Sequence, residues 1–359
     1  PSFSRNSTAY LSDGTLVNTN LPRFEQGKFG KAIMVEEGTT NAFTYPLTQE
    51  YFGGTLRTAG SYYTTSGFKI IATNQPLSGP VPGCKLNITG GKFTVKGKTD
   101  LSAVHIYYRG FDSSGATVIA QTWKKVTPSN GWFEITIDLG AVSGLSYINI
   151  GVGSIFAANY WLEYVQIEAK PYPTSFTDGT RAAERLTIPT EGVLNPQEGT
   201  VECWINLRAW VNGISDNGVW SLTGSTRLDM WFSKYYGNKL GVYDGTAWLN
   251  SGVASSSFVG SWHYIAYTWG SFGQKIYVDG VLKASTTQLI SSAHIGSLLY
   301  IGSYRGSYQA HSLIDDLRIS SRARTDEEIA TAYASGQPLP VDEWTTYKLN
   351  FDGNLNFGR

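Results

Sequence analysis

Short runs of alternating apolar and polar residues recur along most of the chain. Between residues 54 and 169 the clearest runs are 68–73, 104–111, 118–126, 132–139 and 160–167. Turn residues separate these runs at 90–91, 112–115 and 129–131. Alternation with a period of two, in short runs divided by such turns, predicts the β-strands of a sandwich or barrel. The stretch shows no helical periodicity.

Two closely spaced prolines, Pro171 and Pro173, interrupt this pattern. Because proline cannot lie inside a central strand, segment 170–174 is the best domain boundary. A second series of strand-like runs follows it, at 200–206, 228–232, 240–243, 262–269, 275–278, 298–301 and 313–319. Asp279-Gly280 lies between two of these runs and predicts a tight hairpin turn.

One helix is expected near the end of the chain. Thr325 and Glu328 have the spacing of a capping box, residues 329–334 continue the helix, and Gly336 and Pro338 end it. The sequence therefore predicts an all-β fold of two β-sandwich (jelly-roll) domains, with one short C-terminal helix in the second.

Composition narrows the functional classes. Of the 359 residues, 14% are aromatic and only 16% are charged, and 28 basic residues balance 28 acidic ones. A neutral protein has no global field that would draw it to nucleic acid, and no apolar run approaches the roughly 18 residues of a membrane span. We therefore expect uncharged partners, no nucleic acid and no membrane insertion.

The chain begins at Pro1 and its first methionine is Met34, so we expect a fragment of a longer polypeptide. Cys84 and Cys203 fall in different predicted domains, which predicts no disulfide. Two cysteines also cannot form a thiolate-only zinc site.

Sequence motifs of several enzyme classes are absent: there is no His-Glu-x-x-His, Gly-x-Ser-x-Gly, P-loop or Gly-x-Gly-x-x-Gly. Glycoside hydrolysis needs two carboxylates about 5 to 9.5 Å apart. The adjacent acidic pairs at 36–37, 315–316 and 342–343 would point to opposite faces of a strand. We therefore expect the protein not to be an enzyme.

Residues 200–334 resemble the laminin-G-like, concanavalin A-type lectin/glucanase fold. The resemblance rests on the ordered motifs at 260–267, 276–281, 299–302, 313–324 and 326–329. It implies a sandwich whose relatives bind sugars, proteins, calcium or nothing measurable.

Residues 41–176 resemble jelly-roll carbohydrate-binding modules, through segments 107–115, 131–132 and 160–168. The last strand of such modules carries an aspartate for structural calcium where this chain has Glu163. Glu163 is therefore a candidate calcium ligand, and the alternative is an ordinary surface acid.

Both domains together with segments 3–8 and 27–38 resemble minor structural proteins of phage tails and prophages. Residues 27–32 also resemble an early strand of laminin-G-like domains. We therefore divide the chain into an N-terminal segment 1–40 that forms part of the second sandwich, a jelly roll 41–176, and a laminin-G-like sandwich 177–337. Residues 338–359 are then a linker and the start of a further module or a closing strand.

The aromatic excess supplies the candidate binding residues. Flat rings stack on the apolar faces of sugars, while amide, acid and arginine groups bind the hydroxyls. The candidates in the first domain are Tyr63, Tyr107, Arg109, Trp123 and Trp132. In the second domain Trp231 and Tyr236 accompany the candidates Tyr235, Tyr243, Trp248, Tyr304 and Tyr308. Trp204, Trp262 and Trp269 are assigned to the core, and for any single candidate ring packing in a sheet is the alternative.

Asp315 and Asp316 end a family-like strand and are the second pair of candidate calcium ligands, since carboxylates suit this hard cation. The alternative is that they cap turns or pair with Arg318, Arg322 or Arg324.

The sequence thus predicts a non-catalytic adhesion fragment that recognises cell-surface glycan, located on a phage virion or an extracellular bacterial surface. Its partners would be the glycan and other tail subunits. The alternatives are a polysaccharide-degrading glycoside hydrolase or lyase with an appended binding module, and a structural spacer that binds nothing.

Overall fold

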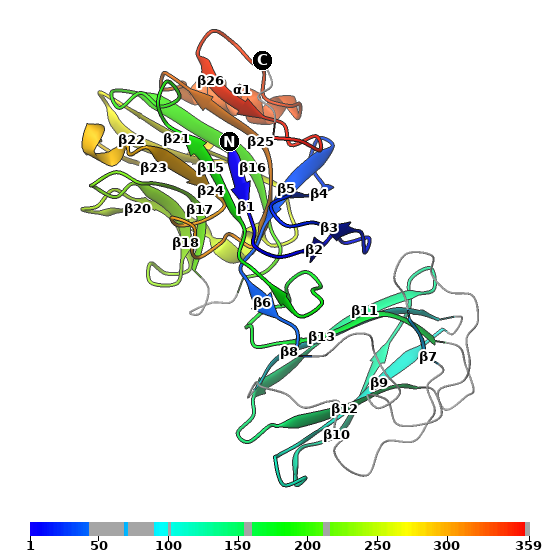
Figure 1. The fold of residues 1–359 in the computed structure, drawn as a ribbon. Coiled ribbons are helices and arrows are strands. Elements are labelled where there is room, and N and C mark those ends of the chain that lie inside the picture. Colours follow the sequence, from blue (N-terminus) through cyan, green and yellow to red (C-terminus); the bar gives the residue numbers. More distant parts are fainter. Residues whose placement is uncertain (43–67, 71–89, 100–101, 154–159, 211–215, 356–359) are drawn as a thin grey trace. The chain divides into compact units, whose positions relative to one another are not determined.

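The computed structural model describes residues 1–42, 68–70, 90–99, 102–153, 160–210 and 216–355. The chain divides into two compact units (Figure 1). The larger unit contains Pro1–Thr8, Val17–Gly38 and Ala182–Arg359, and the smaller unit contains Ala9–Leu16 and Thr39–Arg181. The N-terminal segment is thus shared between the units, and the smaller unit is inserted into the sequence of the larger one.

The larger unit consists of two antiparallel sheets. The seven-stranded sheet has the order β1 (Ser2–Ser4), β15 (Arg185–Pro189), β24 (Leu298–Ile301), β17 (Asp216–Leu222), β18 (Asp229–Ser233), β19 (Lys239–Tyr243), β20 (Trp248–Ala254). The eight-stranded sheet has the order β23 (Val281–Thr286), β22 (Gly273–Val278), β21 (His263–Gly270), β16 (Gly199–Leu207), β25 (Ser312–Ser320), β5 (Lys31–Val35), β4 (Arg23–Gln26), and β26 (Thr345–Leu349) also pairs with β25. Strands from both ends of the sequence therefore complete one sandwich.

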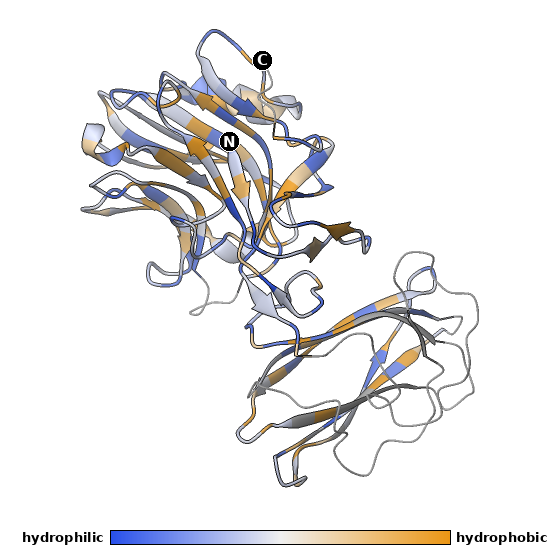
Figure 2. Cartoon of the chain, in the orientation of Figure 1, coloured by the Kyte–Doolittle hydropathy of each residue, from blue (hydrophilic) through white to orange (hydrophobic). Residues whose placement is uncertain are grey.

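The core of the larger unit lies between these sheets. Alternate residues of the seven-stranded sheet, such as Met230 and Phe232 on β18, join alternate residues of the eight-stranded sheet, such as Val201 and Ile205 on β16, in one buried cluster. Figure 2 shows the apolar residues along the strands of both sheets. Trp269 is buried in this cluster, as predicted.

The outer side of the eight-stranded sheet carries the single α-helix of the described residues, α1 (Asp326–Ser335). The predicted capping box is confirmed, because the side chains of Thr325 and Glu328 each accept a hydrogen bond from the other residue's backbone N–H. The helix ends at Gly336, whose φ of 60° lies in the left-handed region. Trp204 is buried between this sheet and the helix, whereas Trp262 is only partly buried beside the same cluster. Short 3₁₀ turns occur at η3 (Ser255–Phe258) and η4 (Ser292–His294).

A buried ionic cluster holds the N-terminal segment in the larger unit. Arg23 Nη2 lies 2.7 Å from both Glu36 Oε2 and Glu184 Oε2. Arg5 Nη1 lies 2.8 Å from Glu184 Oε1, and His311 Nδ1 lies 2.9 Å from Glu36 Oε1. All five side chains are almost completely buried. These contacts join Arg23 of β4 and the residues that follow β1 and β5 to the segments that precede β15 and β25.

The smaller unit contains a four-stranded sheet of β11 (Trp132–Ala141), β8 (Gly90–Thr99), β13 (Tyr160–Glu168) and β7 (Phe68–Ile70), in that order. A three-stranded sheet contains β10 (Thr117–Val126), β9 (Val104–Phe111) and β12 (Tyr147–Gly153). Two short sheets pair β14 (Thr180–Arg181) with β6 (Thr39–Thr40), and β2 (Ala9–Tyr10) with β3 (Leu16–Val17). The structure therefore confirms the all-β fold class.

Candidate functional site

Aromatic side chains gather on the outer face of the seven-stranded sheet. On β18 the neighbours Met230 and Phe232 enter the core, so Trp231 points away from it. The same alternation places Tyr243 outward on β19. Register then brings Tyr243 opposite Trp248 of β20, which places outward rings on adjacent strands.

Two glycines leave room for these rings. Gly241 pairs with Trp231, and a Cβ at Gly241 would overlap the Trp248 ring, so that ring lies across Gly241. Gly218 pairs with Trp231 on the opposite side, and a Cβ there would overlap the backbone at Tyr304. The glycines therefore allow a ring and a loop to approach the sheet closely on both sides of Trp231.

The rings contact one another in a continuous series. Tyr236 stacks on Trp248, with ring centroids 4.5 Å apart and planes inclined by 12°. Trp248 meets Trp231 edge-on at 6.0 Å, and Trp231 lies near-parallel to Tyr304 at 6.2 Å. Tyr304 in turn lies 6.3 Å from Tyr308. We call the rings of Trp231, Tyr236, Tyr243, Trp248, Tyr304 and Tyr308 the aromatic face.

These rings remain accessible from outside. Tyr308 is 52% exposed and Tyr236 is 37% exposed, while the other four rings are half-buried. A half-buried ring is held in place by its neighbours and still offers surface to a ligand. The aromatic face is therefore a preorganised surface that could stack against a flat apolar partner.

Arg227 lies among the rings of this face. Its guanidinium carbon is 4.7 Å from the Tyr243 centroid, 4.8 Å from that of Tyr304 and 5.8 Å from that of Trp231. Its Nε donates a 2.8 Å hydrogen bond to Asp229 Oδ2. Asp229 is only 1% exposed, and this burial raises the pKa of its carboxyl although Arg227 opposes the shift.

Arg305 lies on the loop that carries Tyr304 and Tyr308. Its backbone has a φ of 48° and its N–H donates a 2.7 Å hydrogen bond to Ser221 Oγ, which fixes the loop above β17. Its Nη2 donates to Gly224 O at 3.2 Å, and its guanidinium carbon lies 5.9 Å from the Tyr304 centroid.

Several donors on this face have no hydrogen-bond partner within the described part of the chain. They are Nε1 of Trp231, Nε1 of Trp248 and Nε of Arg305. Buried polar groups normally have partners, and a bound ligand or water can supply them at a site. These three nitrogens are themselves buried, whereas the side chain of Arg227 is 35% exposed and bonds Asp229 through Nε. The rings and the terminal N–H donors of Arg227 therefore match the two kinds of surface that a sugar presents.

The structure brings together four of the ten predicted binding residues, namely Tyr243, Trp248, Tyr304 and Tyr308. Tyr235 is 72% exposed at the β18–β19 turn, where Lys234 Nζ lies 5.0 Å from its ring centroid. It makes no ring contact with the aromatic face among the described residues.

The predicted residues of the smaller unit do not form one described site. Trp123 and Trp132 are both exposed but lie on different sheets, on β10 and β11. Arg109 donates a 2.6 Å hydrogen bond to Thr117 Oγ1 and its guanidinium lies over Phe111. Tyr63 and the side chains of Tyr107 and Glu163 lie outside the described residues.

The sequence analysis did not single out Arg227, Asp229 or Arg305. Arg227 and Asp229 flank Leu228 at the start of a strand-like run, where a charged pair is ordinary. The sequence does indicate where their site lies, because Trp231 is a large ring at the outward position between two apolar neighbours of the same run. The contacts themselves depend on strand register, which the sequence does not give.

The carboxylates of Asp315 and Asp316 bind donors of the protein itself. Asp315 Oδ2 accepts hydrogen bonds from the N–H groups of Lys28 at 2.8 Å and Phe29 at 3.0 Å. Burial raises the pKa of Asp315 to about 6, although these bonds oppose the shift. Asp316 accepts from the Leu339 N–H at 2.6 Å and pairs with Lys348.

The arginines expected as alternative partners of this aspartate pair have other carboxylates. Arg318 binds Glu202, Arg322 binds Glu328, and Arg324 binds Asp342. No group of three or more His, Cys, Asp or Glu side chains that could hold a metal occurs in the part of the chain that the structure describes. Calcium binding at Asp315, Asp316 or Glu163 stays a prediction.

Comparison with known proteins bears on the larger unit. Residues 178–330 match the family model of the concanavalin A-like lectin/glucanases superfamily. Among curated proteins none matches the chain. No helix among the described residues is long and apolar enough to cross a membrane.

Similar solved structures share little sequence with this chain. A heptameric SAP-like pentraxin from Limulus polyphemus is 14% identical over 41% of this chain and 72% of its own, with a TM-score of 0.31. Domain 4 of AbnA, a GH43 extracellular arabinanase from Geobacillus stearothermophilus, solved with arabinotriose, is 17% identical over 45% of this chain and 81% of its own, with a TM-score of 0.35. A Trypanosoma rangeli sialidase in complex with sialic acid is 15% identical over 39% of this chain and 23% of its own, with a TM-score of 0.31. Because residues 178–330 match this family model, the β-sandwich of the larger unit is of the lectin-like, concanavalin A-like type.

Proposed function

We propose that the chain is a non-catalytic carbohydrate-binding module and that it holds glycan on the aromatic face. The observation that carries the proposal is the continuous series of accessible rings from Tyr236 through Trp248 and Trp231 to Tyr304. Stacked rings with nearby N–H donors complement the apolar faces and hydroxyl groups of a sugar. The match of residues 178–330 to the lectin/glucanase superfamily supports this assignment.

The first experiment is a glycan array that includes bacterial surface polysaccharides. Each hit is checked for shortened products and is repeated with calcium and with a chelator. Binding without products supports the non-catalytic module, whereas shortened products overturn it. Loss of binding in the presence of the chelator supports a calcium requirement. Binding to no glycan on the array contradicts the proposed function and favours a structural spacer that binds nothing.

Replacing Trp231 with alanine is expected to weaken glycan binding about tenfold. An aromatic contact contributes about 0.5–1.5 kcal/mol beyond its buried area, and about 1.4 kcal/mol corresponds to tenfold in affinity. Trp344→Ala is the matched control, because Trp344 is an exposed ring on the segment before β26 and contacts Arg322 rather than the aromatic face. Affinity is measured by calorimetry after thermal unfolding has shown that both variants are folded. Equal affinity of the two variants would contradict the aromatic face as the site.

We further propose that the chain serves host attachment in a phage tail or prophage structural protein, at the virion or the bacterial cell surface. This finer assignment rests on the resemblance of both domains, together with segments 3–8 and 27–38, to such proteins. Weak single sites would then be reinforced by multivalency on the virion. Array hits confined to bacterial surface polysaccharides support this role, and hits confined to other glycans contradict it.

A further inference from the structure

Arginine side chains converge on one end of the aromatic face. The guanidinium carbons of Arg227 and Arg305 lie 4.8 Å and 5.9 Å from the Tyr304 centroid. Arg185 reaches the same loop, since a Cβ at Gly306 would overlap its guanidinium. Three cationic side chains therefore surround the loop that carries Tyr304 and Tyr308.

These guanidinium groups have unused donors. An arginine has five N–H donors. Within the described part of the chain, Arg227 donates only from Nε, to Asp229, and the Arg305 side chain donates only from Nη2, to Gly224. The terminal nitrogens of Arg227 are left for a ligand, and its side chain is 35% exposed. Arg305 keeps Nη1 without a partner, and its Nε is both buried and unpartnered.

Two arginines of this end share one acid. Asp229 lies 2.8 Å from Arg227 and also interacts electrostatically with Arg305, so one buried carboxylate faces two guanidinium groups. Other arginines of the larger unit are held differently: Arg23 binds two glutamates, and Arg324 binds Asp342 through both terminal nitrogens. Arg23 and Arg324 are thus each held by two carboxylate contacts, whereas Arg227 and Arg305 keep unpartnered donors beside half-buried rings.

From this arrangement we propose that the glycan bound on the aromatic face is acidic, and that its anionic group lies on Arg227 and Arg305 beside Tyr304. The proposal rests on the proposed function and specifies its substrate class. A guanidinium matches a carboxylate or a sulfate ester with paired hydrogen bonds, and such charge-assisted bonds are about twice as strong as neutral ones. A net charge of zero led us to expect uncharged partners. The proposal replaces this expectation with an acidic glycan, because the local distribution of charge at the site decides which ligand binds.

The test presents acidic polysaccharides beside their neutral forms. Polygalacturonate, alginate, hyaluronan and polysialic acid are each immobilised next to the carboxyl-reduced polymer, and dextran sulfate is immobilised next to dextran. At least one acidic probe should bind, with its neutral form at least tenfold weaker. Whether it is a carboxylated or a sulfated probe identifies the anion. Equal binding of neutral forms, or binding of neutral glycans alone, overturns the acidic ligand while the proposed function stands. Absence of binding to every probe and to the earlier array overturns both.

Arg305→Gln locates the anionic group. We expect this variant to bind the acidic probe about tenfold more weakly and any neutral form within twofold of the parent. Lys283→Gln is the control, because it removes the same charge from an exposed position on β23 of the other sheet. Equal effects of the two variants on the acidic probe would show that only net charge matters and would overturn the assignment to Arg305. A melting temperature equal to that of the parent shows that Arg305→Gln is folded.

Discussion

Replacing Arg23 with methionine is expected to lower the free energy of unfolding of the larger unit by about 3–5 kcal/mol, because it leaves buried carboxylates without their main partner. Arg23 is fully buried and binds Glu36 and Glu184. Burial disfavours its charged form, but the two glutamates hold the pKa of Arg23 above its ordinary value. Without Arg23, Glu184 still contacts Arg5 and Glu36 still contacts His311, but the guanidinium that bridges both glutamates is lost.

Denaturant unfolding of the parent and of three variants checks this result. Arg208→Met removes an exposed arginine and should change stability by less than about 0.5 kcal/mol. The double variant Arg23→Met with Glu36→Gln should recover part of the loss, because it removes one buried charge of each sign. A loss below about 1 kcal/mol in Arg23→Met would show that the cluster does not hold the N-terminal segment.

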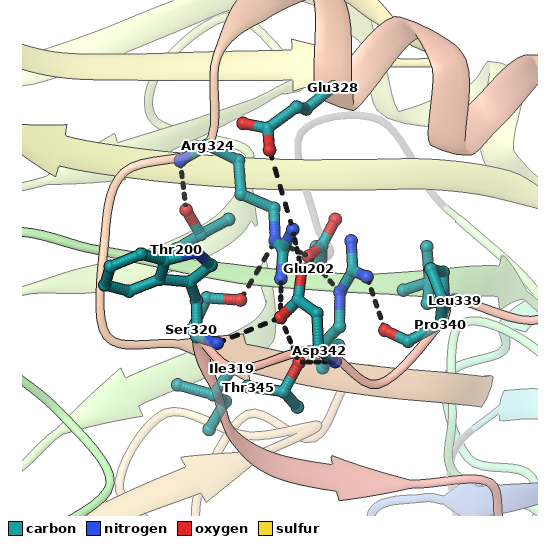
Figure 3. A network of polar contacts seen from close by, with 12 residues as sticks. Thr200, Glu202, Ile319, Ser320, Arg324, Glu328, Leu339, Pro340, Asp342 and Thr345 are labelled. Atoms are coloured by element: carbon teal, nitrogen blue, oxygen red, sulfur yellow. Dashed lines mark hydrogen bonds and ion pairs between the residues drawn. The ribbon is translucent and has the colours of Figure 1, made fainter.

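Replacing Glu202 with glutamine is expected to cost a similar amount, about 3–5 kcal/mol, at a second buried network (Figure 3). Glu202 Oε1 lies 2.6 Å from Arg318 Nε and 3.3 Å from Arg324 Nε. Its other oxygen accepts a hydrogen bond from the Tyr264 hydroxyl. The amide would leave two buried arginines with less compensation, and Arg324 would keep Asp342 at 2.8 Å and Glu328 at 4.0 Å as its acidic partners.

The same network fixes the segment between α1 and β26. Arg318 donates to Pro340 O at 2.6 Å, and Arg324 donates to both oxygens of Asp342. Glu202→Gln should therefore raise hydrogen exchange in residues 336–345 before it affects β18 and β19. Glu327→Gln, an exposed position on α1, is the control. Unchanged hydrogen exchange in residues 336–345 would contradict the prediction that Glu202 helps to hold the segment before β26.

Local patterns carried most of the fold prediction. Alternation and turn residues give most of the strands, and the Thr325–Glu328 spacing gives the one helix, because these signals depend on neighbours in sequence. The resemblance of residues 27–32 to an early laminin-G-like strand predicted that the N-terminal segment belongs to the second sandwich. In the structure β5 pairs with β25 of that sandwich and β4 pairs with β5. The boundaries were less accessible. Residues 9–16 group with the smaller unit, and β26 pairs with β25, which is the closing-strand alternative for residues 338–359.

The candidate site was less predictable than the fold. Composition indicates that rings are in excess, but not which of them meet. Trp231 and Tyr304 come together because β17 pairs with both β18 and β24, which is a long-range register. At Asp316 a φ of 53° and a shift in the pairing of β16 with β25 break the simple alternation of a strand. Side-chain directions there could not be derived from the sequence.

The most direct measurement of the central claim follows the tryptophan indole N–H signals by NMR while glycan is added. The chain has 11 tryptophans, and single Trp→Phe variants assign the signals of Trp231, Trp248, Trp204, Trp344, Trp123 and Trp132. With the strongest array hit, Trp231 and Trp248 should shift progressively to saturation, while buried Trp204 and distant Trp344 stay unchanged. Saturable binding that leaves Trp231 and Trp248 unmoved, or that moves only Trp123 or Trp132 of the smaller unit, would contradict the aromatic face as the glycan site.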